Sequence, residues 1–157
     1  MTADTINAAE IRINARWLIP IEPANTVLDH QAVLIQGGRI AAILPQSEAD
    51  QRYRAKEVVD LPRHVVLPGL INSHSHAAMS LFRGMADDLP LMAWLKDHIW
   101  PAEGEFISET FVADGTQLAM AEMLRTGTTT FSDMYFFPEI VAQLARDTGM
   151  RAQICFP

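Results

Sequence analysis

The apolar run at residues 65–71 (VVLPGLI), which ends at Asn72-Ser73-His74, constrains the fold of this chain more than any other feature. A continuous run of this kind is typical of a strand buried on both faces of a parallel sheet. The residues that follow predict, in order, a long loop, a helix, a strand, a second helix and a third strand. This alternation predicts repeated βα units around a parallel sheet.

Local signals place the boundaries of these elements. We expect a helix over residues 107–126, with Ser108 as its N-cap and Gly127 closing its C-terminus. Residues 128–134 (TTTFSDM) are rich in β-branched side chains and predict the second strand. Pro138 opens the second helix, and residues 151–156 predict the third strand.

The α/β region is too short to form a closed barrel by itself. A complete (β/α)8 TIM barrel needs roughly 250 residues. Residues 65–157 have room for the first three strands and two helices only. We therefore expect an incomplete TIM-barrel domain, so that the chain is the N-terminal part of a longer protein and requires the missing C-terminal half of the barrel. An open three-stranded α/β unit is the alternative.

The first 64 residues predict a small β-element. A strand is expected over residues 11–20, and Gly37-Gly38 between two β-rich runs predicts a hairpin. Residues 46–57 are polar and predict a surface loop, followed by a short strand at residues 58–60. We expect a loose tail at residues 1–9.

The segment His74-Ser75-His76 is the strongest chemical signal, because it stands at the end of a predicted buried strand. Strand side chains alternate in direction, so His74 and His76 point to the same side and can reach one ion. Neutral imidazole is a good zinc ligand. Catalytic groups of βα barrels lie at this end of the strands. The competing interpretation is an incidental His-x-His.

Two histidines do not complete a catalytic zinc site, which usually has three protein ligands. Other candidates are His64, His98, Asp87, Asp88 and Asp133. His64 precedes the strand, and His98 suits a surface or packing role. Asp133 ends the second predicted strand and suits either a hydrogen-bond acceptor behind the metal ligands or a structural cap. None of these residues is a convincing third ligand.

Composition excludes several other classes of protein. The formal net charge is −7 with no run of Lys or Arg, which argues against nucleic acid or an anionic membrane as partner. The sequence has no GxGxxG, P-loop or GxSxG motif. The single cysteine, Cys155, excludes a cytidine-deaminase type of zinc site and fits a reducing cytoplasm. We expect no signal peptide and no membrane span, and a cytoplasmic protein.

The segment VVLPGLINSHSHAAMSLFRGMADDLPLMAWLKDHIWPAE closely resembles the first barrel strand and following loop of the amidohydrolase superfamily. Within it, the resemblance is to the 5-methylthioadenosine/S-adenosylhomocysteine deaminase group and its chlorohydrolase relatives. The later segment EMLRTGTTTFSDMYF fits the same group. The resemblance covers residues 58–156 well, and residues 11–60 more loosely resemble the family's β-sandwich portion. It implies a TIM barrel, with residues 1–64 as the N-terminal portion of a small β-sandwich.

The resemblance also implies roles for individual residues. His74 and His76 correspond to metal ligands, with Zn²⁺ expected and Fe²⁺ or Mn²⁺ compatible with the same ligands. Glu103, in the W-P-x-E segment, corresponds to the carboxylate that binds the ribose hydroxyls of nucleosides. Trp94, nine positions earlier, corresponds to a ring that packs against the purine. The alternatives are a solvated loop residue for Glu103 and a core residue for Trp94.

The implied activity is hydrolytic deamination of adenine nucleosides (5′-methylthioadenosine, S-adenosylhomocysteine or adenosine) to the inosine analogue and ammonia. The family's remaining metal ligands and its general acid/base come from later strands, so no residue here is assigned a catalytic role. Some members carry an arginine where this chain has Ile154-Cys155-Phe156-Pro157. Alternatives are a guanine or other purine-ring deaminase, a chlorohydrolase, or a non-catalytic metal-binding or interaction fragment. A homo-oligomer is left open.

Overall fold

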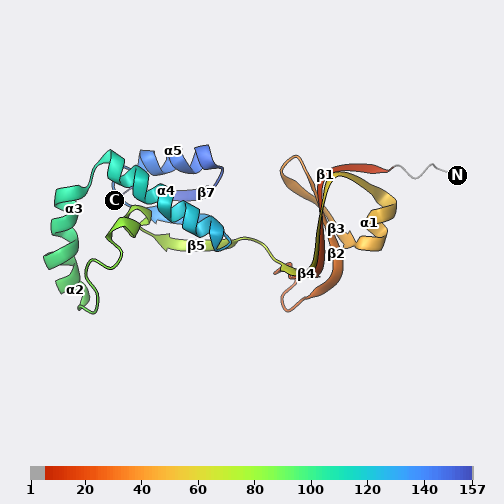
Figure 1. Cartoon of the computed structure of the whole chain (residues 1–157), viewed down its shortest axis with the longest axis horizontal. Coiled ribbons are helices and arrows are strands. Elements are labelled where there is room, and N and C mark those ends of the chain that lie inside the picture. The colour runs from red at the N-terminus through yellow and green to blue at the C-terminus, as the bar shows by residue number, and fades with distance from the viewer. Residues whose placement is uncertain (1–5, 157) are drawn as a thin grey trace. The chain divides into compact units, whose positions relative to one another are not determined.

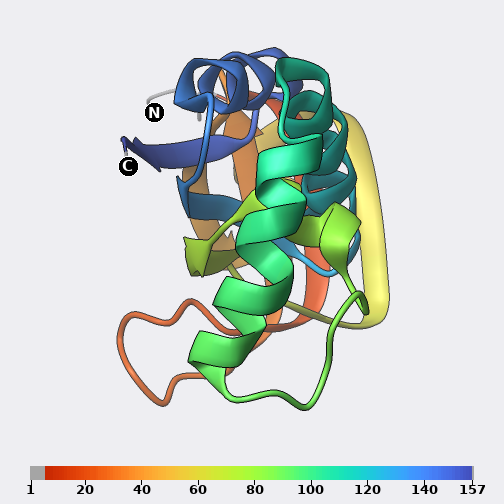
Figure 2. The same ribbon diagram turned by 90° about the vertical axis from the view of Figure 1, so that its left-hand side faces the viewer.

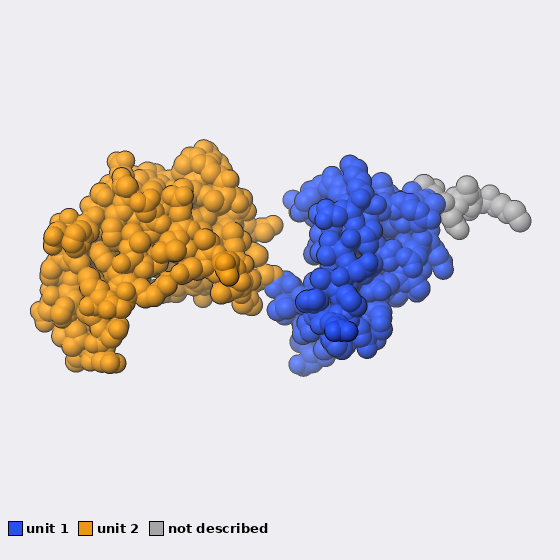
Figure 3. Space-filling model, in the orientation of Figure 1, with its two compact units in different colours: residues 1–68 blue, residues 69–157 orange. Residues whose placement is uncertain are grey.

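The computed structural model describes residues 6–156, and the chain divides into two compact units, residues 1–68 and 69–157 (Figure 3). Each unit is built around a sheet of its own, labelled in Figure 1. Within residues 6–156, no helix combines the length and the hydropathy needed to span a membrane.

The first unit contains a four-stranded sheet in the order β3-β2-β1-β4. β1 pairs antiparallel with β2 and parallel with β4, and β2 pairs antiparallel with β3. Small and aliphatic side chains, among them the fully buried Ala32 and Leu34, form its core. The elements are β1 (Asn7–Leu18), β2 (Leu28–Gln36), β3 (Arg39–Pro45), α1 (Gln46–Arg52) and β4 (Tyr53–Val66).

The predicted hairpin is confirmed. Gly37 and Gly38 connect β2 to β3 with φ angles of 59° and 69°. Positive φ at both central residues is what a two-residue turn of this kind requires, and glycine adopts it without steric cost.

Two expectations for this unit are wrong. Residues 46–57 are not a surface loop, because they form α1 and the start of β4. Ala49 on α1 is fully buried, and Asp50 pairs with the largely buried Arg12 at 2.7 Å, so tertiary contacts hold this polar segment in a helix. The expected loose tail at residues 1–9 is also wrong from Asn7 onward, where β1 begins; residues 1–5 lie outside the described residues.

The second unit contains a parallel sheet in the order β5-β6-β7, with α4 packed against β6 and α5 packed against β7 (Figure 1). This arrangement confirms the predicted alternation of strands and helices. The elements are β5 (Leu70–Ser75), the 3₁₀ helix η1 (Ala77–Phe82), α2 (Leu91–Ala93), the π-helix η2 (Trp94–Ile99), α3 (Trp100–Phe106), α4 (Glu109–Arg125), β6 (Thr128–Met134), α5 (Pro138–Thr148) and β7 (Arg151–Cys155).

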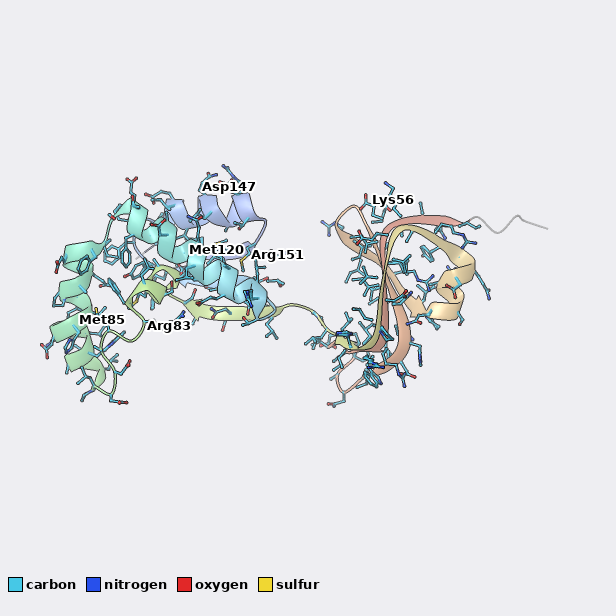
Figure 4. The ribbon with its side chains drawn as sticks, viewed as in Figure 1. Lys56, Arg83, Met85, Met120, Asp147 and Arg151 are labelled. Atoms are coloured by element: carbon cyan, nitrogen blue, oxygen red, sulfur yellow. The ribbon has the colours of Figure 1, made fainter. Side chains whose placement is uncertain are left out.

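Most of the predicted boundaries of this unit are confirmed. The Ser108 Oγ accepts a hydrogen bond from the Phe111 amide at 3.2 Å, so Ser108 is the N-cap of α4. α5 begins at Pro138 and ends before Gly149, whose φ is 75°. Apolar side chains of α4 and β6 are fully buried between these elements, including Phe131 and Met120, of which Figure 4 labels Met120.

The expected continuous strand at residues 65–71 is wrong. Val66 ends β4, and β5 begins only at Leu70. Pro68 separates the two strands because it has no N–H to donate and because it restricts the backbone conformation of the residue before it. Leu70 and Ile71 are also exposed, at 53% and 71%, and among the described strands β5 pairs with β6 alone.

The packing of α4 on η1 depends on a glycine. A Cβ atom at Gly115 would lie 2.4 Å from the carbonyl oxygen of Ala78, which is closer than carbon and oxygen atoms can approach. The Ser80 hydroxyl donates a hydrogen bond to the Gly115 carbonyl at 2.8 Å. Since η1 directly follows His76, this contact holds the backbone next to the candidate metal ligands.

Replacing Gly115 with Ala should therefore destabilise the protein by about 1–3 kcal/mol, the usual cost of overpacking. Gly104→Ala is the matched control, because Gly104 is also helical and has open space around its Cβ position. The control should be neutral or stabilising, since alanine favours helix formation. Urea unfolding of the two variants checks this, and equal midpoints would contradict the packing argument.

Candidate metal and substrate site

The candidate site lies where β5 and β6 end. Carboxyl ends of parallel strands meet at one edge of a sheet, so the last residues of β5 and β6 are neighbours. His74 lies on β5 and His76 follows its last residue. The two imidazole rings are 5.2 Å apart between centroids and nearly perpendicular, at 83°. The structure therefore brings the two predicted metal ligands together.

A backbone hydrogen bond determines which nitrogen of His76 can bind a metal. The Nδ1 atom of His76 lies 2.6 Å from the carbonyl oxygen of Met134, at the end of β6. A carbonyl oxygen can only accept, so Nδ1 carries the hydrogen. In the neutral imidazole the lone pair is then on Nε2. This pattern, in which a carbonyl orients the ring from behind, is typical of metal-binding histidines.

Asp133 on β6 fixes the backbone around the two histidines. Its side chain is buried, and Oδ1 accepts hydrogen bonds from the Ser75 hydroxyl at 2.9 Å and the Ala77 amide at 2.7 Å. Among the described residues, Oδ2 has no partner. Burial raises the pKa of Asp133, while the Ala77 amide, the Ser75 hydroxyl and nearby His76 oppose that rise. Asp133 thus caps η1 and accepts hydrogen bonds behind the candidate ligands.

A cavity of about 370 Å³ opens next to His76 and has predominantly apolar walls. Trp94 and Glu103, the two predicted substrate-binding residues, line it together with His76. His74 is not among the residues that line it. The remaining lining residues are Met79, Leu91, Leu95, Ile99, Trp100, Met134, Tyr135 and Phe136.

Tyr135 connects Glu103 to the end of β6. Its hydroxyl donates a hydrogen bond to Oε1 of Glu103 at 2.8 Å, and its ring centroid lies 6.1 Å from that of His76. The phenol is only 6% exposed. Burial, followed by the Glu103 carboxylate, raises the pKa of Tyr135 well above its usual value. Sequence reasoning missed this residue, although its position directly after β6 was a usable signal.

The other candidate ligands lie elsewhere. His64 is exposed on β4, His98 is exposed on η2, and Asp87 and Asp88 are exposed on the loop between η1 and α2. None of them lines the cavity next to His76. Among residues 6–156, no group of three or more His, Cys, Asp or Glu side chains is arranged to hold a metal ion.

The buried phenol predicts a specific pH dependence. A raised pKa means that the protonated Tyr135 stabilises the fold fully below pH 10.0 and loses this contribution as the pH rises further. Tyr135→Phe should therefore leave the 295 nm phenolate titration of the folded protein unchanged between about pH 9 and about pH 11. If Tyr135→Phe instead reduced the absorbance change at 295 nm over this range, Tyr135 would ionise near its ordinary pKa. Its hydrogen bond to Glu103 would then be in doubt.

Known proteins resemble this chain over nearly its whole length. It is 58% identical over 149 residues to a 5-methylthioadenosine/S-adenosylhomocysteine deaminase of Saccharophagus degradans, covering 95% of this chain and 33% of that protein. It is 41% identical over 148 residues to a 5′-deoxyadenosine deaminase of Methanococcoides burtonii, covering 94% and 33%. The chain thus spans about a third of the length of the curated relatives that it matches.

A solved structure extends the comparison to the fold. The zinc-bound adenosine deaminase of Xanthomonas campestris superposes with a TM-score of 0.92 at 45% identity, over 94% of this chain and 34% of that one. The model of the amidohydrolase family matches residues 65–157. This chain therefore belongs to the amidohydrolase family, and its three-stranded parallel sheet is the N-terminal part of that family's TIM barrel.

Proposed function

We propose that the full-length protein is a zinc-dependent deaminase of adenine nucleosides, which releases ammonia and leaves the inosine analogue. The observation that carries this proposal is that His76, Trp94 and Glu103 line one and the same cavity. A candidate metal ligand, an aromatic ring and a carboxylate are thereby combined in one space. The relatives named for 5-methylthioadenosine, S-adenosylhomocysteine and 5′-deoxyadenosine support the substrate class.

The residues at the end of β5 fit a divalent metal. The carbonyl of Met134 leaves Nε2 of His76 with its lone pair, and the ring of His74 stands edge-on beside it. We infer that His74 and His76 hold Zn²⁺, although Fe²⁺ and Mn²⁺ accept the same ligand types. The metal would supply Lewis-acid activation of water. Its remaining ligands and the general acid/base would come from the part of the barrel beyond residue 157.

The cavity residues divide the binding of a nucleoside between base and sugar. The indole ring of Trp94 offers an aromatic face on which a purine can stack. An ionised carboxylate can accept several hydrogen bonds, and Tyr135 occupies only one position on Oε1 of Glu103. The rest of that carboxylate is available to the two adjacent hydroxyls of a ribose. The bond from Tyr135 also fixes the direction in which the carboxylate faces.

The remaining parts of the proposal concern the whole protein. We infer that residues 1–64 contribute the N-terminal portion of a small β-sandwich and that the missing C-terminal half completes the barrel. A cytoplasmic location fits the single cysteine, Cys155, which is free in the described structure.

Ammonia release by the zinc-loaded full-length protein tests the proposed function directly. We expect turnover of 5′-methylthioadenosine, S-adenosylhomocysteine or adenosine, and little turnover of guanine. Activity on guanine or on a chlorinated ring, with none on any nucleoside, would be compatible with the family assignment but would refute nucleosides as the substrates.

Replacing Glu103 with Ala separates nucleosides from free bases. Loss of even one charged hydrogen bond, worth roughly 1.5–3 kcal/mol, should lower kcat/KM for adenosine by about 10-fold to 100-fold, and loss of both ribose contacts by more. Turnover of a free base should not change, because a free base has no ribose hydroxyls. Glu105→Ala is the matched control, since Glu105 is exposed on the same helix and does not line the cavity. Equal losses for the two variants would contradict the role of Glu103.

A further inference from the structure

Trp94 and Glu103 lie on one continuous helical segment, composed of α2, η2 and α3 (Figure 2). The middle of this segment, η2, is wound as a π-helix: the amide of Trp100 donates its hydrogen bond to the carbonyl of Leu95, five residues earlier. Such wide turns are rare and are found frequently at functional sites. Here the wide turn lies between the two candidate substrate-binding residues.

The sequence supplies a cause for the wide turn. Pro101 lies near the start of α3, directly after the π-helical residues. In a regular α-helix the proline ring would collide with the carbonyl oxygen four residues earlier, which belongs to Asp97. A wider turn at this point moves that carbonyl away from the ring. A proline inside a helix is also a standard cause of local irregularity.

The wide turn changes the side of the helix on which Trp94 lies. In a regular α-helix each residue advances by about 100°, so residues nine positions apart lie about 180° apart, on opposite faces. A π turn absorbs one additional residue. The separation of Trp94 and Glu103 then corresponds to eight α-helical steps, which places them only about 80° apart.

The other helical residues that line the cavity follow the same pattern. On a regular α-helix this set would spread over about 240°, or two thirds of the circumference. With one residue absorbed in the wide turn, the same set falls within about 140°. The set consists of Leu91, Trp94, Leu95, Ile99, Trp100 and Glu103.

We propose that the π-helical turn at residues 94–99 is a positioning element of the substrate site: it presents Trp94 to the same cavity as Glu103, so that one nucleoside contacts both. This inference rests on the proposed function, because it assigns the base to Trp94 and the ribose to Glu103. The C-terminal side of the turn is fixed by Ile99 and Ala102, which are 2% and 8% exposed, whereas Leu91 at its other end is 66% exposed.

Changing the length of the turn by one residue isolates its contribution. Inserting one Ala after Lys96 adds a ninth α-helical step between Trp94 and Glu103, which places them about 180° apart. Lys96 is exposed and does not line the cavity, so the insertion removes no contact. The buried Ile99 and Ala102 should keep α3 in place, so the exposed N-terminal side rotates by about 100° and carries Trp94 out of the cavity. Lys96→Ala, which keeps the length, is the matched control.

The experiment measures the affinity of the zinc-loaded full-length protein for inosine, the expected product, by titration calorimetry. Insertion of one Ala after Lys96 should raise the Kd roughly tenfold or more, as expected when stacking on a base is lost. Lys96→Ala should bind as the unmodified protein does. Trp94→Ala should weaken binding in the unmodified protein and add little in the insertion variant, because Trp94 has already left the cavity there.

A second variant tests the residue count in the opposite direction. Deleting Lys96 in a Pro101→Ala background allows a regular α-helix, because no proline ring then meets the carbonyl of Asp97. Eight α-helical steps then separate Trp94 from Glu103, which is the same separation of about 80° that the wide turn gives. This variant should therefore bind inosine about as tightly as the unmodified protein.

The outcomes separate the two proposals. If the unmodified protein binds inosine and the insertion variant binds it as tightly as Lys96→Ala does, the role of the wide turn is refuted and the proposed function stands. Equal effects of Trp94→Ala with and without the insertion would refute it in the same way, as would loss of inosine binding when Lys96 is deleted in the Pro101→Ala background. If the unmodified protein neither binds inosine nor releases ammonia from nucleosides, the proposed function fails and this inference fails with it.

Discussion

The buried carboxylate of Asp133 is the interaction on which the arrangement of this site depends. It joins two neighbouring strands by accepting hydrogen bonds from Ser75 at the end of β5 and from Ala77 at the start of η1. The residue between those two donors is His76, so its backbone is held on both sides. The carbonyl of Met134, next to Asp133, then orients the His76 ring. Burying a carboxylate is costly, and the hydrogen bonds to Oδ1 offset part of that cost.

Around this anchor, the cavity is assembled from segments that are distant in sequence. Tyr135 directly follows β6, and its hydroxyl reaches across to Glu103 on α3. The helical segment that carries Glu103 also carries Trp94, on the far side of a π-helical turn. The candidate metal ligand and the candidate contacts for base and sugar are thus positioned by strand ends on one side and by one irregular helix on the other.

Features with local causes could be predicted from the sequence. The Gly37-Gly38 turn, the Ser108 cap and the pairing of His74 with His76 each follow from a few adjacent residues. Features that depend on distant contacts could not. The helix α1 is held by an ion pair between residues 38 positions apart, and the bond from Tyr135 to Glu103 spans 32. The relation of Trp94 to Glu103 was hidden as well, because regular helical periodicity would place them on opposite faces.

The hydrogen bond between His76 Nδ1 and the Met134 carbonyl implies that this carbonyl prepares His76 to bind a metal through Nε2. Long-range nitrogen–proton NMR of the histidine rings, recorded on the full-length protein before and after zinc is added, tests it most directly. We predict that neutral His76 carries its proton on Nδ1 in the metal-free protein, and that zinc shifts the Nε2 resonance of His76 together with a ring nitrogen of His74. A proton on Nε2 of His76, or ring resonances that do not shift when zinc is added, would contradict this role of the Met134 carbonyl.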